Sequence, residues 1–393
     1  KNLLLINDDS TKLYKNSHTA REKFETWRDT YNLEIHDDII FSDLSTAYNI
    51  GVPPLRKRDL TPISENDRII NKFEEILRHN NVSDKENSFN RLIALFICKL
   101  VDEINKDEAS EVEFQYKFRA DDYEILEDRL QRLYTEGMLK FMRERVIYYP
   151  ADYPKRVFEN HTGQNRKNAI EDIKDAFKKI KFYTNNDFAF IDVHNEELFY
   201  KNGKILVEVV QLFQKYRIVH DKKSQLLGDL FEQLLDKGFK QNEGQFFTPM
   251  PLTRFIWDCL PLKKFDTWPR VIDYACGAGH FLIDAVEAIN YFIPSNNNNW
   301  VRDSIFGIEK DYRLARVSKV SLFMNGSGEG NIIFGDGLDN NEQIKPDSFD
   351  ILTANPPYSV ASFKQHLQLK QNNFALLDSI SNNGSEIEVL FIE

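Results

Sequence analysis

A short apolar run near the end of the chain stops abruptly at an amide, two prolines and an aromatic ring. These four residues are Asn355, Pro356, Pro357 and Tyr358, in the stretch FDILTANPPYS. The run from Ile351 to Ala354 has no helical period, which predicts a buried strand. Because two prolines cannot continue a central ladder, the chain must leave the sheet at Asn355. Open α/β sheets bind ligands past the carboxyl ends of their strands, so the pattern predicts a ligand site here.

Acidic residues follow three other short apolar runs, each at a place where a strand is expected to end. They are Asp273 in VIDYACGAG, Glu309 in FGIEKD and Asp336 in IIFGDG. A carboxylate at the position of Glu309 can accept hydrogen bonds from both hydroxyls of a ribose. Asp336 is placed to accept a hydrogen bond from an adenine amino group. Successive acids at strand ends therefore predict a nucleoside site.

The turn that follows Asp273 is rich in glycine and leads into an expected helix. Glycine permits positive φ and a close approach of ligand to backbone. Such a turn is also common where glycine serves helix packing alone, so the turn by itself leaves both interpretations open. Leu282 stands where a GxGxxG pattern needs its third glycine, and no P-loop pattern occurs. A ligand without a pyrophosphate is therefore favoured over a nicotinamide dinucleotide, and S-adenosylmethionine is the candidate.

The elements that position these residues alternate in type. Four apolar runs, each ended by glycine, an acid or asparagine, are predicted strands, and the segments 281–292 and 313–326 between them are predicted helices. This alternation predicts an α/β fold with a parallel, doubly wound sheet. The four runs account for only part of such a sheet, so we expect its remaining strands beyond Glu393.

The chain before this sheet is predicted to be mainly helical. A wide apolar stripe over residues 89–104 predicts a helix that packs on other helices, with Ser88 as its N-cap. A short strand is predicted over residues 188–193. We divide the chain into an unassigned segment 1–62, a mainly helical domain 63–240 and a partial nucleoside-binding domain 241–393.

Composition limits the surroundings in which the chain works. The net charge of −11 argues against a free-standing nucleic-acid binder driven by charge, although a local basic groove or a separate subunit remains compatible with it. No apolar run reaches the roughly 18 residues that a membrane span needs. Three cysteines (Cys98, Cys259 and Cys276) without CxxC spacing indicate a reducing compartment, and we predict a cytoplasmic protein.

Three motifs in a fixed order carry a family resemblance. EGQFFTPMPL (243–252), DYACGAGHF and NPPY together resemble the adenine-specific N6 DNA methyltransferases. The chain is most similar to the modification subunit of type I restriction–modification systems and to fused type II relatives. The resemblance implies a Rossmann-like class I S-adenosylmethionine methyltransferase fold. It also implies double-stranded DNA as the substrate, and specificity and restriction subunits or fused domains as partners.

The resemblance also assigns roles to residues of this sequence. The loop that covers the methionine part of the cofactor would be Gln245, Phe246, Phe247, Thr248 and Pro249. The turn beneath the cofactor would comprise Asp273, Ala275, Gly277, Ala278, Gly279 and His280. The ribose would be held by Glu309, and the adenine ring would face Asp336 and Gly337.

The catalytic role falls on the proline motif. The lone pair of the exocyclic N6 amine of adenine is delocalised into the ring, so the amine is a poor nucleophile. If the Asn355 side-chain oxygen and the Pro356 carbonyl accept both N6 hydrogens, the nitrogen is drawn toward sp³ geometry and no strong base is needed. Pro357 stiffens the loop, and Tyr358 would stack on a base flipped out of the duplex.

Two other functions use the same residues. One is a methyltransferase that acts on another planar amide or amine, such as a protein glutamine or an RNA base. The other is a non-catalytic assembly subunit, which the acidic charge and the incomplete sheet both favour. A plain loop with two prolines is the simplest reading of NPPY alone, and the accompanying motifs argue against it.

Overall fold

The chain divides into two compact units, Lys1–Pro54 and Leu55–Glu393. The computed structural model describes residues 54–63, 68–117, 120–150, 153, 164–183, 187–219, 248–295, 297–339, 341–367, 369 and 374–393. The predicted domain boundary at 240/241 lies outside the described residues. The division of the chain into three domains therefore stays a prediction.

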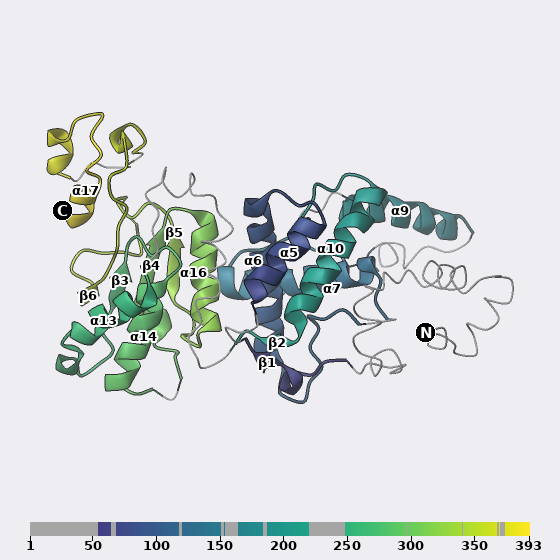
Figure 1. The fold of residues 1–393 in the computed structure, drawn as a ribbon, viewed down its shortest axis with the longest axis horizontal. Helices are drawn as coiled ribbons and strands as arrows, with labels where there is room; N and C mark the ends of the chain where they lie inside the picture. Colours follow the sequence, from purple (N-terminus) through teal and green to yellow (C-terminus); the bar gives the residue numbers. More distant parts are fainter. Residues whose placement is uncertain are drawn as a thin grey trace. The chain divides into compact units, whose positions relative to one another are not determined.

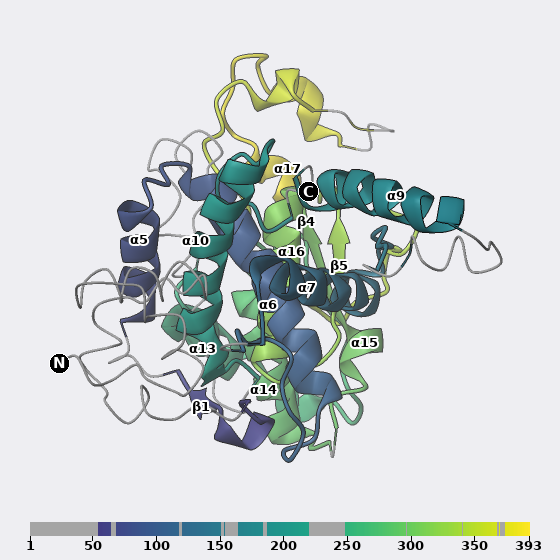
Figure 2. The ribbon, with the colours of Figure 1, turned by 90° about the vertical axis from the view of Figure 1, so that its right-hand side faces the viewer.

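The first half of the described chain is mostly helical, as predicted. Its elements are η2 (Lys57–Asp59), β1 (Thr61–Pro62), α5 (Ile69–His79), α6 (Lys85–Asn105), α7 (Tyr123–Gly137), η4 (Met138–Met142), α9 (Gln164–Tyr183), α10 (Glu196–Gln214) and β2 (Tyr216–Arg217). The two short strands β1 and β2 pair in parallel. Figure 2 shows α5, α6, α7 and α10 gathered into one helical part.

Helix α6 carries the predicted apolar stripe but begins earlier than expected. Its N-cap is Asp84, whose side chain accepts a hydrogen bond of 2.8 Å from the Asn87 backbone N–H. The predicted N-cap, Ser88, lies inside the helix, and its hydroxyl donates to the Asp84 carbonyl at 2.7 Å. The prediction for Ser88 was wrong because the carboxylate of Asp84 caps the same helix one turn earlier.

The core of this helical part is aromatic and aliphatic. Phe96 of α6 packs edge-on against Phe213 of α10, with ring centroids 5.0 Å apart. The ring of Phe73 on α5 lies 6.3 Å from the Phe213 ring, centroid to centroid. All three rings are fully buried. The stripe is thus helix-packing core, as the sequence predicts.

The predicted strand over residues 188–193 is absent, and the segment is buried but irregular. The Asn202 side chain of α10 donates to the Phe188 carbonyl at 3.2 Å and accepts from the Phe190 N–H at 2.8 Å. This side-chain amide satisfies backbone groups that a neighbouring strand would otherwise bond. The prediction of a strand was therefore wrong. The segment is a loop whose backbone is hydrogen-bonded by Asn202.

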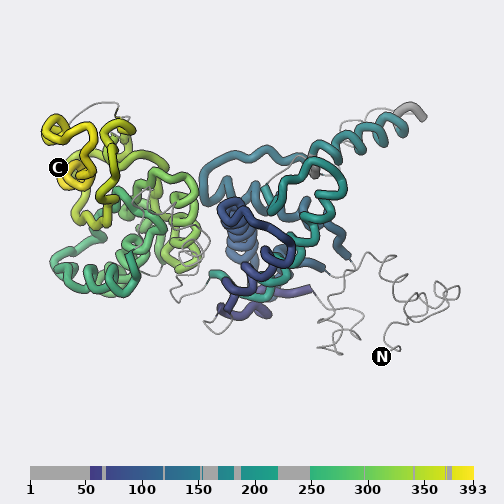
Figure 3. Tube along the Cα trace, turned by 45° about the horizontal axis from the view of Figure 1, so that its top comes forward, coloured from purple at the N-terminus to yellow at the C-terminus, as the bar shows by residue number. Residues whose placement is uncertain are grey.

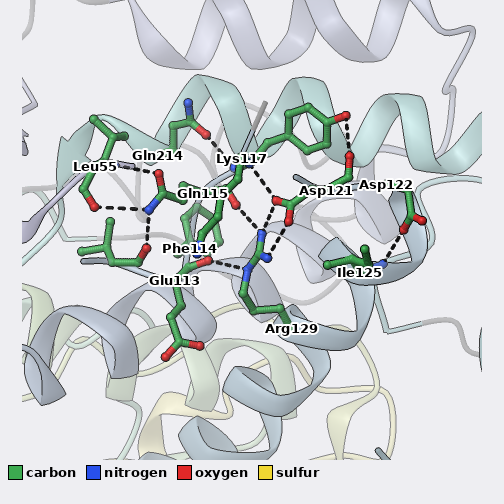
Figure 4. Close-up of polar contacts among 12 residues, drawn as sticks. Leu55, Glu113, Phe114, Gln115, Lys117, Asp121, Asp122, Ile125, Arg129 and Gln214 are labelled. Atoms are coloured by element: carbon green, nitrogen blue, oxygen red, sulfur yellow. Dashed lines mark hydrogen bonds and ion pairs between the residues drawn. The ribbon is translucent and has the colours of Figure 1, made fainter. Parts of the chain in front are cut away.

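The loop between α6 and α7 is fixed by a polar network (Figure 4). The Arg129 guanidinium forms a two-pronged ion pair with Asp121, with nitrogen–oxygen distances of 2.8 and 2.5 Å. The same side chain donates to the carbonyls of Glu113 and Gln115 at 2.9 and 2.6 Å. The loop also contacts α10, because the Gln214 side chain at the end of that helix accepts a hydrogen bond of 2.9 Å from the Tyr116 N–H.

The second half of the described chain is built on a four-stranded parallel sheet (Figure 1). Its elements are α13 (Met250–Cys259), η5 (Leu262–Lys264), β3 (Val271–Asp273), α14 (His280–Phe292), α15 (Val301–Ser304), β4 (Ile305–Glu309), α16 (Tyr312–Met324), β5 (Asn331–Phe334) and β6 (Ile351–Leu352). The spatial order β5-β4-β3-β6 places the third, second, first and fourth strands side by side. This is the order of the first four strands of the doubly wound fold, so the predicted fold class is confirmed.

The two faces of the sheet have different covers. Val271, Ile305 and Ile332 share a buried cluster with residues of α13, α14 and α16, whereas Ile272 and Phe306 pack on loop residues of the other face. Alternation of side chains along each strand explains this division. Both faces of the sheet are thus covered by apolar residues, as is typical of parallel sheets.

Strand β6 is less buried than the sequence predicts. Leu352 is 54% exposed, and within the described sheet β6 pairs with β3 alone. The predicted apolar run thus forms a short strand, Ile351–Leu352, whose second residue is exposed in the described part of the chain.

Helix α16 joins the two halves of this unit. Leu314, Val317 and Val320 belong to the same buried cluster as the residues of α6. The rings of Phe323 on α16 and Phe141 on η4 lie 4.5 Å apart. One helix therefore packs on both the sheet and the helical part.

The last described elements are η6 (Phe363–Gln365), η7 (Leu376–Ser379) and α17 (Glu388–Ile392). They form a small core of their own, in which Phe363, Leu377 and Leu390 pack with Leu338 from the loop after β5. Figure 3 shows this yellow segment folded back beside the part of the chain that carries the strands. Among the residues described, no helix is both long and apolar enough to span a bilayer.

Candidate active site

Glu309 is held in a fixed orientation at the carboxyl end of β4. The Gly277 N–H donates to its Oε2 at 2.9 Å, and the Asp311 N–H donates to its Oε1 at 2.8 Å. The backbone of Lys310 contributes a further hydrogen bond to this carboxyl group, and each carboxylate oxygen can accept more than one hydrogen bond. Glu309 thus presents two parallel acceptors, which suit a vicinal diol.

Asp273 is an ionisable group enclosed at the end of β3. It is 1% exposed, and its Oδ1 accepts a hydrogen bond of 3.0 Å from the Ala275 N–H. The pKa of Asp273 is raised to about 8, mainly by burial and also by the neighbouring Glu309, against the lowering effect of the Ala275 hydrogen bond. Burial also raises the pKa of Glu309, which hydrogen bonds from Asp311 and Gly277 oppose. Two adjacent buried carboxyls of this kind favour a ligand that brings positive charge.

This burial predicts a pH-dependent stability. The unfolded Asp273 ionises near its ordinary pKa of 3.8 while the folded residue stays protonated to about 8. The free energy of unfolding should therefore fall by up to about 1.4 kcal/mol per pH unit between these values. Asp273→Asn keeps the acceptor for Ala275 and removes this slope, which urea unfolding from about pH 5 to 8 measures. An exposed Asp303→Asn control should follow the wild type, and parallel curves for wild type and Asp273→Asn would contradict the assignment.

Asp336 lies just after β5 at the same edge of the sheet. Its Oδ1 accepts the Leu338 N–H at 3.0 Å, and its Oδ2 lies 2.8 Å from the Lys310 ammonium. A Cβ on Gly337 would lie 2.2 Å from the Tyr274 carbonyl oxygen. Only glycine therefore lets the loop after β5 approach the turn after β3 so closely.

The glycine turn lies against β4 and α16. The Cys276 N–H donates to the Ile308 carbonyl at 3.0 Å. Gly279 has a φ of +84°, and a Cβ there would come within 2.5 Å of the Ser318 hydroxyl. The positive φ and the close contact with Ser318 both require glycine at position 279. Gly277 has a different role, since its N–H donates to Glu309.

Thr248 connects the three sequence motifs. Its carbonyl oxygen lies 2.9 Å from His280 Nδ1 at the start of α14, and its hydroxyl accepts a hydrogen bond of 3.0 Å from Asn355 Nδ2. Because the amide nitrogen of Asn355 donates to Thr248, its oxygen is left to accept from a ligand. The loop before α13, the glycine turn and NPPY thus meet at one place.

The contact predicts a role for the Thr248 hydroxyl. Thr248→Val keeps the shape of the side chain but removes the acceptor, so the amide of Asn355 loses its orienting partner. For the methyl transfer that the sequence resemblance implies, we expect kcat to fall about tenfold, the value of one hydrogen bond, whereas Thr248→Ser should keep most of the activity. Steady-state kinetics of the full-length protein measure both. Equal rates for the two variants would show that the hydroxyl does not orient Asn355.

The remaining predicted residues fall into three groups. Gln245, Phe246 and Phe247 lie outside the described residues. Pro249 is the exposed N-cap of α13, and Ala278 is buried beneath the turn. Pro356 and Pro357 are half-buried, and Tyr358 is 45% exposed. The ring of Tyr358 is thus accessible from solvent at the end of the strand.

Sequence reasoning missed two residues of this edge. Asp311 caps α16 and its N–H holds Glu309, and Lys310 pairs with Asp336. The signal for Asp311 was available, since an aspartate directly before a helical run is a typical N-cap. The Lys310 contact joins residues 26 positions apart and leaves no local signal.

Comparisons with known proteins agree with this geometry. Residues 222–392 match the family model described as N-6 DNA Methylase. The chain is 28% identical over 174 residues to the type I restriction enzyme EcoEI methylase subunit of Escherichia coli, an alignment that covers 43% of this chain and 34% of the relative.

Two further relatives resemble the chain over similar parts of their length. The type I restriction enzyme MjaIX methylase subunit of Methanocaldococcus jannaschii is 25% identical over 240 residues, covering 58% of this chain and 40% of the relative. The type II methyltransferase M.VspI of a Vibrio species is 30% identical over 161 residues, covering 41% and 35%. The alignments span less than half the length of each curated relative. Residues 222–392 therefore resemble the N-6 DNA methylase family, and methylase subunits of type I restriction enzymes are among the proteins to which the chain is similar.

Proposed function

We propose that the whole protein is a site-specific DNA methyltransferase that acts on the N6 amine of adenine within a restriction–modification system. The observation that carries this proposal is the Thr248 contact, which links the upstream loop, the glycine turn and Asn355 of NPPY. The N-6 DNA methylase match over residues 222–392 supports the same reaction class.

The residues at the sheet edge fit S-adenosylmethionine as the cofactor. Glu309 is held by backbone N–H groups at the end of β4, an orientation that suits acceptance from the ribose hydroxyls. Asp336 supplies an acceptor for the adenine amine, and the buried carboxyl of Asp273 lies at the end of β3 beside the same turn. When bound, the cofactor supplies an electrophilic methyl group on a sulfonium.

The residues of NPPY prepare the adenine for this methyl group. The Asn355 oxygen and the Pro356 carbonyl would accept the two N6 hydrogens, so that the nitrogen lone pair leaves the ring plane. The proline ring of Pro357 restricts φ and keeps these acceptors in place before the substrate arrives. Orientation and preorganised acceptors would supply much of the rate, which suits a site with an amide and no strong base.

The accessible ring of Tyr358 suits a base that comes from outside the fold. An adenine inside duplex DNA cannot reach a strand-end site, so it must rotate out of the stack. Tyr358, which is 45% exposed, would then stack on the flipped base.

We also propose that this chain works with other protein parts. Its net charge of −11 is unfavourable for holding DNA alone, so a specificity subunit or domain would supply groove contacts, and a restriction subunit or domain would complete the system. The sparse, unpaired cysteines make a cytoplasmic location the proposal for its compartment.

The experiment is an analysis of methylated products. The full-length protein is expressed with its specificity partner in a host that lacks N6-methyladenine, and DNA, RNA and protein are digested to their monomers. We expect N6-methyldeoxyadenosine in DNA alone. Methylated glutamine or RNA adenine would instead support the alternative acceptors, and no methylated product would support a non-catalytic assembly role.

A further inference from the structure

The residue that orients Glu309 is itself fixed by a neighbouring arginine. Asp311 donates its N–H to Glu309, and its side chain caps α16 by accepting the Arg313 N–H at 2.8 Å. The Arg313 guanidinium also grips the Asp311 carboxylate, with distances of 3.0 and 3.2 Å from Nε and 2.5 Å from Nη2. The position of Asp311 therefore depends on Arg313.

Arg313 extends this chain of contacts into the helical part. Its Nη1 forms an ion pair with Glu86 in the first turn of α6. The side chains of Asp311, Arg313 and Glu86 are 10%, 21% and 48% exposed, so the contact runs from the protected site toward the surface. Glu86 and Arg313 are 227 residues apart in sequence.

We propose that Arg313 is a positioning residue for the cofactor, and that Glu86 extends this function to the helical part. The inference rests on the proposed role of Glu309. Half-exposed ion pairs contribute little to stability, so the value of this pair lies in geometry rather than in holding the fold together. Arg313 fixes Asp311, Asp311 fixes one oxygen of Glu309, and α6 fixes the outer end of Arg313. The helical part thereby contributes to a site that lies at the edge of the sheet.

A second ion pair between the same two parts offers a matched control. Arg143, which follows η4, pairs with Glu329, which follows α16, at 2.9 Å. This pair has a similar exposure, with side chains 53% and 34% exposed, but neither residue has a described hydrogen bond to Asp311 or Glu309. Glu86→Gln and Glu329→Gln thus each remove one charge from an ion pair between the same two parts. Only the Glu86 pair is connected, through Arg313 and Asp311, to Glu309.

The experiment is calorimetric titration of the full-length protein with S-adenosylmethionine. We expect Arg313→Met to raise the Kd about tenfold, Arg313→Lys about fivefold because it keeps charge without the fork, and Glu86→Gln about threefold. Glu329→Gln should keep the wild-type Kd. A Glu86→Gln, Arg313→Met double variant should bind like Arg313→Met alone, because both changes break one chain of contacts.

Kinetics distinguish positioning from a loss of structure. The KM for S-adenosylmethionine should rise in the Arg313 variants while kcat at saturating cofactor stays at the wild-type value. A wild-type Kd in both Arg313→Met and Glu86→Gln would overturn the inference. Glu86 is half-exposed, so its variant decides the matter if Arg313→Met does not fold. Failure of the wild-type protein itself to bind S-adenosylmethionine would contradict the proposed function, and this inference with it.

Discussion

Replacement of Asn355 by alanine is expected to lower kcat for adenine methylation by about a hundredfold to a thousandfold. In the proposed mechanism Asn355 supplies one of two acceptors for the N6 hydrogens, and its side-chain nitrogen already donates to the Thr248 hydroxyl at 3.0 Å. Loss of one preorganised polar group at a reacting centre has this order of effect. Methyl transfer from labelled S-adenosylmethionine to DNA measures the rate.

The same variant should leave cofactor binding unchanged, because Glu309 and Asp336 keep their contacts. Asn355→Asp, which retains an acceptor oxygen, should be more active than Asn355→Ala. The control is Asn105→Ala, which removes an exposed amide on α6 that bonds Glu136 and Lys140. Activity in Asn355→Ala above a tenth of the wild-type rate would exclude a central role for the amide.

Replacement of Glu309 by glutamine is the second large effect, and it acts on binding. One carboxylate oxygen becomes an NH₂ group. This NH₂ group then faces the N–H of either Gly277 or Asp311, so that two donors face each other. One acceptor for the ribose is also lost, together with the charge. We expect the Kd for S-adenosylmethionine to rise at least about a hundredfold, since hydrogen bonds to charged groups contribute about 1.5–3 kcal/mol each.

Calorimetry measures this effect directly. The exposed Glu287, changed to glutamine in the same way, should bind the cofactor as the wild type does. Adenosine should lose affinity for Glu309→Gln in parallel, whereas a nucleobase without ribose should not. A Kd within threefold of the wild type would show that Glu309 does not hold the ribose.

The strands of this fold could be predicted because each has a local signal. The runs that end at Asp273, Glu309 and Phe334 are short, apolar and bounded by glycine or charge, and all form the parallel sheet. The order of the strands, β5-β4-β3-β6, comes from the structure, because the sequence pattern predicts parallel strands but not their neighbours. The exposure of Leu352 was not predicted, because an apolar composition does not say which strands flank a given strand.

Local errors came from competing hydrogen-bond partners. Ser88 and Asp84 both have N-cap chemistry, and only the structure decides that the carboxylate caps α6. The irregular segment around Phe190 depends on an asparagine of α10, twelve positions further on. An apolar pattern carries no information about such a partner.

The site itself was predictable in parts but not as a whole. Strand-end acids and NPPY are visible as residues, whereas the bond between Thr248 and Asn355 joins positions 107 apart. The link from Glu309 through Arg313 to Glu86 is likewise invisible in any window of sequence. The fold adds the contacts between distant residues that orient these side chains, such as Thr248 with Asn355 and Asp311 with Glu309.

The most direct test of the central claim is a crystal structure of the full-length protein with sinefungin, a non-reactive analogue of S-adenosylmethionine. The account predicts the ribose hydroxyls on the two oxygens of Glu309 and the adenine amine on Asp336, with the analogue's amine directed toward Asn355. Density for the nucleoside away from the carboxyl ends of β3, β4 and β5, or a ribose without contact to Glu309, would contradict it.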